Sequence, residues 1–110
     1  MTDARIERRY CAIIQFEKSS TIARIAGSFP AILEMVQRWS NNDLEQLCRS
    51  NDGQLFGFIF KTKKPAKMLS SEFETCSGTH GRDTFIVFEL GEECSSSGGF
   101  QRALAWIQLH

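Results

Sequence analysis

Few residues of this chain could do chemistry, and Glu17 is the first of them. It follows an apolar run, Arg8–Phe16, so its carboxylate would lie at the end of a strand. A carboxylate in that place can hold Mg²⁺ beside a phosphate group. A Glu followed at once by Lys18 is also typical of a solvated turn, and this is the commoner interpretation.

A Ser/Gly-rich stretch near the C-terminus is a candidate anion site. Its residues are Ser95, Ser96, Ser97, Gly98 and Gly99, and a helical pattern follows them. Backbone amides and hydroxyls at the start of a helix can hold a phosphate group. No Lys follows at the spacing of a phosphate-binding loop, so the pattern favours a Ser N-cap on a flexible loop.

Basic residues are concentrated in two stretches, which comprise Arg8, Arg9, Lys61, Lys63, Lys64 and Lys67. They could contact a nucleic-acid backbone or an acidic protein, but a solvated helix start is the commoner explanation for the lysines. We expect the Arg pair and the Lys group to lie at opposite ends of neighbouring antiparallel strands. That arrangement would divide the basic surface rather than concentrate it.

The cysteines and histidines do not form a recognisable metal motif. Cys76 and His80 have a spacing that some zinc sites use, and Cys94 could approach them, but the chain has no C-x-x-C pair. Four widely spaced cysteines in apolar surroundings indicate reduced thiols. We therefore expect no metal and no cofactor. A catalytic pair of Cys and His stays open, because such partners meet in space and not in sequence.

Length and composition limit the fold. The chain has 110 residues, 42% of them hydrophobic, enough for one domain over residues 1–110 with residues 1–7 as a loose leader. Its 13 basic and 13 acidic residues balance, so no overall field would attract nucleic acid. The chain shows neither a signal peptide nor an apolar run of membrane-spanning length, so we expect a cytoplasmic protein without membrane contact.

Apolar periodicity predicts the secondary structure. Strands are predicted at Arg8–Phe16, Leu44–Ser50, Gln54–Thr62 and Asp83–Leu90, and helices at Ser20–Trp39, Pro65–Cys76 and Gly99–His110. Because Pro30 interrupts the first helical pattern, we expect a firm helix only from about Phe29. This order predicts an α+β fold, a ferredoxin-like β-α-β-β-α-β sandwich with an extra C-terminal helix. The first and third strands, apolar on both faces, would be central.

Two short segments, Phe85–Glu92 and Gly99–Ile107, carry a resemblance to a known group, with looser similarity over Arg9–Phe16 and Asp52–Thr62. The chain resembles the small SinR-like proteins, ferredoxin-like relatives of the CRISPR-associated adaptation endonuclease and of VapD-type ribonucleases. The resemblance implies a dimer that holds a metal through an Asp at the end of the first strand. This chain has Glu17 there and no Asp, a departure that puts nuclease activity in doubt.

Three functions follow from these observations. Because no convergent set of acid, base, nucleophile or metal ligands is visible, we expect a non-enzymatic protein-interaction or regulatory protein. A phage or mobile-element inhibitor of a bacterial defence system, of the anti-CRISPR type, fits that description. The alternatives are a degenerate metal-dependent nuclease that uses Glu17, and a nucleic-acid-binding module in which Phe56, Phe58 and Phe60 stack on bases.

The fourth strand predicts self-association. Asp83–Leu90 would be an edge strand in this fold, yet it is apolar on both faces. Proteins usually pair such an edge with another strand, cover it with a helix or loop, or place charged side chains on it. We therefore expect a homodimer whose interface includes Phe85, Val87, Phe88, Phe100 and Trp106.

Overall fold

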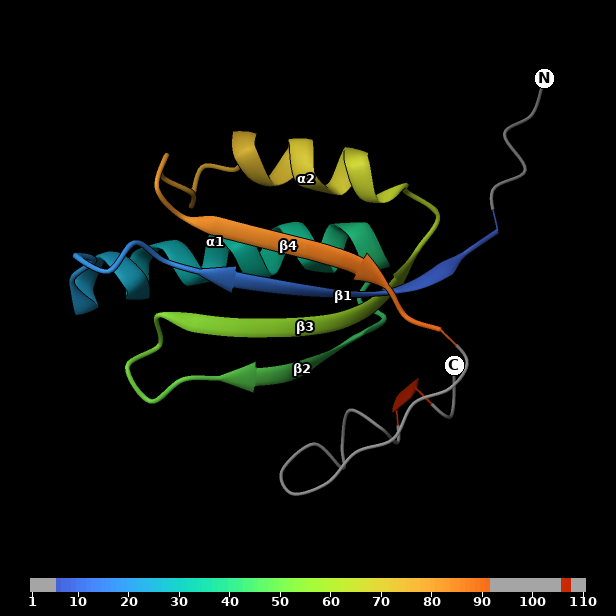
Figure 1. Ribbon diagram of the computed structural model, residues 1–110, viewed down its shortest axis with the longest axis horizontal. Helices are drawn as coiled ribbons and strands as arrows, with labels where there is room; N and C mark the ends of the chain where they lie inside the picture. The colour runs from blue at the N-terminus through green and yellow to red at the C-terminus, as the bar shows by residue number, and fades with distance from the viewer. Residues whose placement is uncertain (1–5, 92–105, 108–110) are drawn as a thin grey trace.

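The computed structural model describes residues 6–91 and 106–107, and within them the fold is α+β, as predicted (Figure 1). The elements are, in chain order, β1 (Arg8–Gln15), α1 (Ile22–Ser40), β2 (Leu44–Arg49), β3 (Leu55–Thr62), α2 (Ala66–Thr75) and β4 (Thr84–Glu89). The four strands form one sheet in the order β2-β3-β1-β4, and every neighbouring pair is antiparallel. The prediction that the first and third strands are central is therefore confirmed.

Both helices cover the same face of the sheet, and the main core lies between them and the strands. The side chains of Phe56, Phe58 and Phe60 lie on this face and are almost fully buried. Phe29 of α1 packs edge-on against Phe56, with ring centroids 4.9 Å apart. Because this face is closed, the three phenylalanines of β3 cannot stack on bases, and that version of nucleic-acid binding is wrong.

The regular part of helix α1 begins earlier than predicted. Its N-cap is Thr21, whose hydroxyl accepts a hydrogen bond from the Arg24 amide at 3.1 Å. The expectation of a firm helix only from about Phe29 is wrong, because this cap and the burial of Ile25 hold the first turns in place. Pro30 lies inside the helix.

The turns follow the sequence signals. Asn41 ends α1 in the left-handed conformation with φ 52°. The β2–β3 hairpin turns at Asn51–Gly53, where Gly53 has φ 75°, a value that favours glycine. Asp52 stabilises this turn by accepting the amide of Gln54 at 3.0 Å.

A second, smaller cluster lies on the opposite face of the sheet. It consists of Cys11, Ile59 and Trp106, with Ile13 and Leu90 packed at its margin. Trp106 and Ile107 are helical, and the rest of the helix predicted at Gly99–His110 lies outside the described residues. Arg9 of β1 holds this segment by donating to the Ile107 carbonyl at 3.0 Å. Among the described residues, no helix is long and apolar enough to cross a membrane.

Candidate functional site

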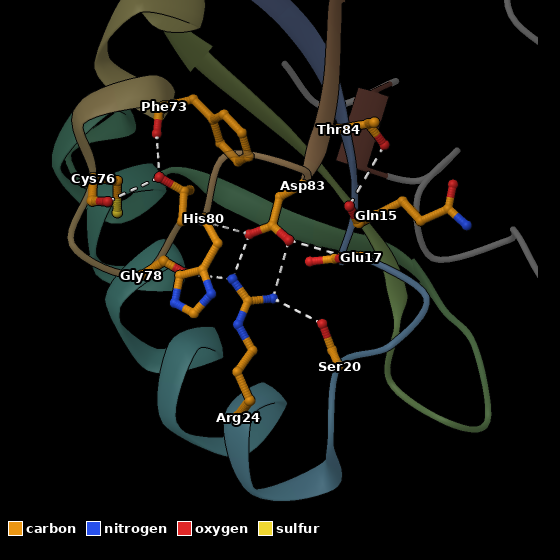
Figure 2. A network of polar contacts seen from close by, with 11 residues as sticks. Gln15, Glu17, Ser20, Arg24, Phe73, Cys76, Gly78, His80, Asp83 and Thr84 are labelled. Atoms are coloured by element: carbon orange, nitrogen blue, oxygen red, sulfur yellow. Dashed lines mark hydrogen bonds and ion pairs between the residues drawn. The ribbon is translucent and has the colours of Figure 1, made fainter.

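Three segments meet at the end of β1 around the carboxylate of Asp83 (Figure 2). They are the loop after β1, the first turn of α1 and the loop between α2 and β4. Arg24 of α1 donates from Nη1 to Asp83 Oδ1 at 3.0 Å and from Nη2 to Oδ2. The backbone amides of Glu17 and His80 donate to the same carboxylate at 3.0 Å and 2.8 Å. Two bonds from guanidinium and two from amides thus join the three segments.

The guanidinium of Arg24 makes several further contacts. It donates to the Ser20 hydroxyl and to the Gly78 carbonyl, each at 3.3 Å. Its Cζ lies 4.5 Å from the centre of the Phe16 ring, within the range of a cation–π contact. Its Nε is the one buried side-chain polar atom without a partner among the described residues. Arg24 is therefore engaged within the fold and is not presented to solvent.

The ion pair between Arg24 and Asp83 is almost completely buried from solvent. The Asp83 side chain is 0% exposed and that of Arg24 is 13% exposed. Burial raises the pKa of Asp83, but the hydrogen bonds from Arg24, His80 and Glu17 together outweigh it, so this pKa lies below its ordinary value. Asp83 stays ionised and fully occupied at neutral pH. It acts as a structural link and cannot serve as a general base.

Glu17 lies beside this network, and its own carboxylate points to a different neighbour. It is 3.8 Å from Nη1 of Arg82. The two side chains line a hollow of about 420 Å³ together with Gln15, Lys18 and Thr84. Within residues 6–91 and 106–107, no three His, Cys, Asp or Glu side chains gather where they could hold a metal ion. The carboxylate of Asp83, which accepts from the Glu17 amide, is already paired with Arg24.

The cysteines and His80 have different surroundings in the fold. Cys76 Sγ lies 3.8 Å from the Ala31 carbonyl, and His80 is exposed. Cys94 lies outside the described residues. Burial, and then the neighbouring Cys48 thiol, raise the pKa of Cys11 to about 11, and burial raises the pKa of Cys48 as well. Both thiols stay protonated at neutral pH, a state of low reactivity.

The basic residues are closer together than predicted. Arg8 lies opposite Thr62 and Arg9 lies opposite Lys61 in the β1–β3 register. The expectation of opposite ends is wrong, because the start of one strand lies beside the end of its antiparallel neighbour. Arg8, Arg9 and the group Lys61, Lys63, Lys64 and Lys67 therefore occupy the same end of the sheet.

Acidic residues neutralise part of this basic end. Arg8 pairs with Glu89 at 3.3 Å, Lys61 with Glu7 at 3.8 Å and Lys64 with Glu72 at 3.0 Å. Lys63 and Lys67 make no ion pair with another described residue. The basic end thus keeps two unpaired lysines near the start of α2.

The residues predicted for a dimer interface lie on different surfaces. Phe85 and Val87 pack against the main core, and Phe85 stacks on Phe73 with centroids 4.5 Å apart. Trp106 is buried against the opposite face. Phe88 is 44% exposed, and its neighbour on the same face, Ile86, is 57% exposed. Phe100 and the candidate anion site Ser95–Gly99 lie outside the described residues.

The pair of Arg24 and Asp83 was missed in the sequence, although one signal pointed to it. Arg24 occupies the first turn of a helix, where the helix dipole disfavours a cation. A cation there calls for a compensating carboxylate, and only the fold shows that Asp83 supplies it. Comparisons with models of known protein families, with curated proteins and with solved structures find no match for this chain.

Proposed function

We propose that this protein acts by binding other protein chains rather than by catalysis, and that it forms a homodimer through β4. The single observation that carries this proposal is the exposure of Ile86 and Phe88 on an edge strand. Two large apolar side chains side by side on a strand that pairs on one side only are a liability for a monomer.

The two edges of the sheet differ in a way that supports β4 as the pairing edge. β2, the other edge, has an irregular register between Gln46 and Cys48, and it carries Glu45 and Arg49. Bulges and charges protect an edge against pairing. β4 has a regular register with β1 and only one charged residue, Glu89, at its end. Among the described residues no strand pairs with its outer side.

A dimer of this kind would be isologous, because the same residues of both copies meet at a two-fold axis. Ile86 and Phe88 would then lose their exposure to solvent against the second copy. Phe85 and Val87 would stay inside each protomer, where they support β4 from the helix side. The proposed interface therefore contains fewer residues than the interface predicted from the sequence.

The chemistry of the described residues gives little support to the nuclease alternative. The carboxylate of Asp83, which accepts from the Glu17 amide, is occupied by Arg24. Glu17 has a cation, Arg82, as its neighbour, and a positive neighbour disfavours binding of a metal ion. Catalysis by Glu17 is therefore the second candidate function, after protein binding.

We further propose that the fold is a ferredoxin-like sandwich. The chain order of strands and helices and the central place of β1 and β3 support this interpretation. Together with the resemblance to the SinR-like group, it suggests a cytoplasmic protein whose first partner to test is a bacterial defence complex, as for an anti-CRISPR inhibitor.

The homodimer is tested by light scattering over a concentration series. We expect the wild-type protein to reach twice the 12.5 kDa mass of the chain. Phe88→Lys should remain at the mass of one chain, because a buried lysine without a partner is costly. Ile22→Lys is the matched control, because Ile22 is 84% exposed but lies on α1. A wild-type mass of one chain at high micromolar concentration would overturn the proposal.

A further inference from the structure

A pocket lies at the end of the sheet where β1 begins and β3 ends. Its volume is about 310 Å³, and its walls include Arg8, Tyr10, Lys63, Pro65, Ala66 and Glu89. This volume is at the lower end of the range for small-molecule sites. Two cations, a phenol and the first residue of a helix thus surround one small space, a combination that favours an anion.

Tyr10 gives the clearest indication that the pocket takes a ligand. The residue is only 4% exposed, and its ring stacks on Phe60 with centroids 6.0 Å apart. Its hydroxyl has no hydrogen-bond partner among the described residues, yet it is not one of their fully enclosed polar atoms. Tyr10 is one of the residues that line the pocket, and its hydroxyl is the only polar atom that its side chain can offer there. A nearly buried polar group without a partner is unfavourable unless a bound molecule or water pairs with it.

The start of α2 offers further donors at the same place. Pro65 is the N-cap residue and has no side-chain acceptor, so no side chain caps the helix. The amide of Lys67 therefore lacks the partner that a capping side chain would supply, whereas the amide of Met68 donates to the Pro65 carbonyl at 3.0 Å. The first turn contains no acidic residue. The partial positive charge of the helix N-terminus is thus left uncompensated by its own first turn.

The cations at the pocket remain available. Lys63 makes no ion pair among the described residues. Arg8 donates to Glu89 from Nη1 at 3.3 Å, but both side chains are more than half exposed. Such an exposed pair is weak, and a guanidinium has further donors to offer. Glu89 reduces the positive charge of the site and accepts one hydrogen bond from Arg8, which leaves the other guanidinium donors and the Lys63 ammonium for a ligand.

We propose that this pocket binds the phosphate monoester group of a small organic molecule. The donors come from β1, from the β3–α2 loop and from the start of α2, so they converge on a group that accepts from several directions. A phosphate monoester has three terminal oxygens and close to two negative charges, whereas a carboxylate has two oxygens and one charge. Pro65 and Ala66 supply apolar surface for the organic part.

The test is isothermal titration calorimetry with inorganic phosphate, adenosine 5′-monophosphate and, as an uncharged control, adenosine. We expect both phosphate compounds to bind the wild-type chain and adenosine not to bind. Tyr10→Phe removes only the hydroxyl. It should weaken binding about tenfold, as expected when a hydrogen bond to a charged group is lost. It should leave the unfolding midpoint unchanged, because the hydroxyl has no partner among the described residues.

Two lysine variants separate a built site from general attraction. Lys63→Gln should weaken binding about tenfold. Lys18→Gln makes the same change of charge at the opposite end of β1 and should leave the affinity unchanged. The proposal is overturned if neither phosphate compound binds at millimolar concentration, if Tyr10→Phe binds as the wild type does, or if both lysine variants weaken binding equally. It is also overturned if a 5′-phosphorylated oligonucleotide binds and adenosine 5′-monophosphate does not.

Discussion

At the residue scale, Asp83 shows how one buried carboxylate can organise several loops. Four donors converge on it, two from Arg24 and one each from the amides of Glu17 and His80. A buried ion pair contributes little net stability compared with apolar residues of similar shape. Its value here lies in joining segments that are far apart in the chain. The loss of one partner, however, leaves the other buried and unpaired.

Asp83→Asn tests this point. The substitution keeps the shape of the side chain but removes its charge, so Arg24 would remain buried without a counter-ion. We expect the free energy of unfolding in urea to fall by about 3–5 kcal/mol. Arg38→Met is the control, because Arg38 pairs with Glu34 on the exposed surface of α1 and such pairs contribute little. Equal effects of the two variants would contradict the structural role of Asp83.

The depressed pKa of Asp83 also predicts how stability depends on pH. Because this pKa is lower in the folded chain than its unfolded value of about 3.9, the unfolded state binds more protons in acid. The contribution of Asp83 is therefore present above about pH 4 and is lost as the pH falls through the folded pKa. The difference in unfolding free energy between wild type and Asp83→Asn should shrink in acid. A difference that stays constant from neutral pH to strong acid would contradict this assignment.

At the element scale, the sequence predicts most of the sheet but not which side chains come together at its two ends. The central strands β1 and β3 could be recognised because both are apolar on two faces, and the hairpin because Asp52-Gly53 favours a tight turn. Pro30 led to the expectation that the helix is firm only from about Phe29, whereas the cap at Thr21 and the burial of Ile25 stabilise it from Ile22. The grouping of Arg8 with the lysines follows from the antiparallel pairing of β1 and β3, because the start of one strand lies beside the end of the other.

The loop between α2 and β4 approaches α1 so closely that one glycine is required for packing. A Cβ on Gly78 would lie 2.7 Å from the Ser28 carbonyl oxygen and 3.0 Å from the Ala31 Cβ. We expect Gly78→Ala to lower the free energy of unfolding by about 1–3 kcal/mol, because the loop must shift away from the helix. Gly81→Ala in the same loop is the matched control, since a Cβ there has no atom within 4 Å. Urea unfolding of both variants measures the difference, and a neutral Gly78→Ala would show that the loop can move freely.

At the scale of the whole molecule, the sheet has apolar side chains on both faces, but the two faces are covered differently. The helices α1 and α2 cover one face along much of the sheet (Figure 1). On the other face, Trp106 packs over Cys11 and Ile59, whereas Ile86 and Phe88 of β4 are exposed. The proposed dimer lies at that exposed part. The proposed phosphate pocket lies at the basic end of β1 and includes Glu89 of β4, but the variants that test it, Tyr10→Phe and Lys63→Gln, lie outside β4.

The last prediction concerns the cover that Trp106 provides. We expect Trp106→Ala to lower the free energy of unfolding by about 3–5 kcal/mol, as for other buried large side chains. The variant should also open access to Cys11, which burial and the Cys48 thiol keep protonated, with a pKa of about 11. In the native wild-type chain Cys11 should therefore resist iodoacetamide at neutral pH, whereas in Trp106→Ala it should be alkylated, as mass spectrometry of peptides would show.

A variant on the helix side separates this local effect from general loss of stability. Leu69 is fully buried in the main core, so Leu69→Ala should destabilise the chain by about 2–5 kcal/mol. Because it leaves the opposite face of the sheet untouched, Cys11 should stay protected in this variant under native conditions. Protection of Cys11 in Trp106→Ala as well would show that other parts of the chain cover this face. Alkylation of Cys11 in both variants would mean that the label reports unfolding of the whole domain, and Trp106 would then have no separate role as a cover.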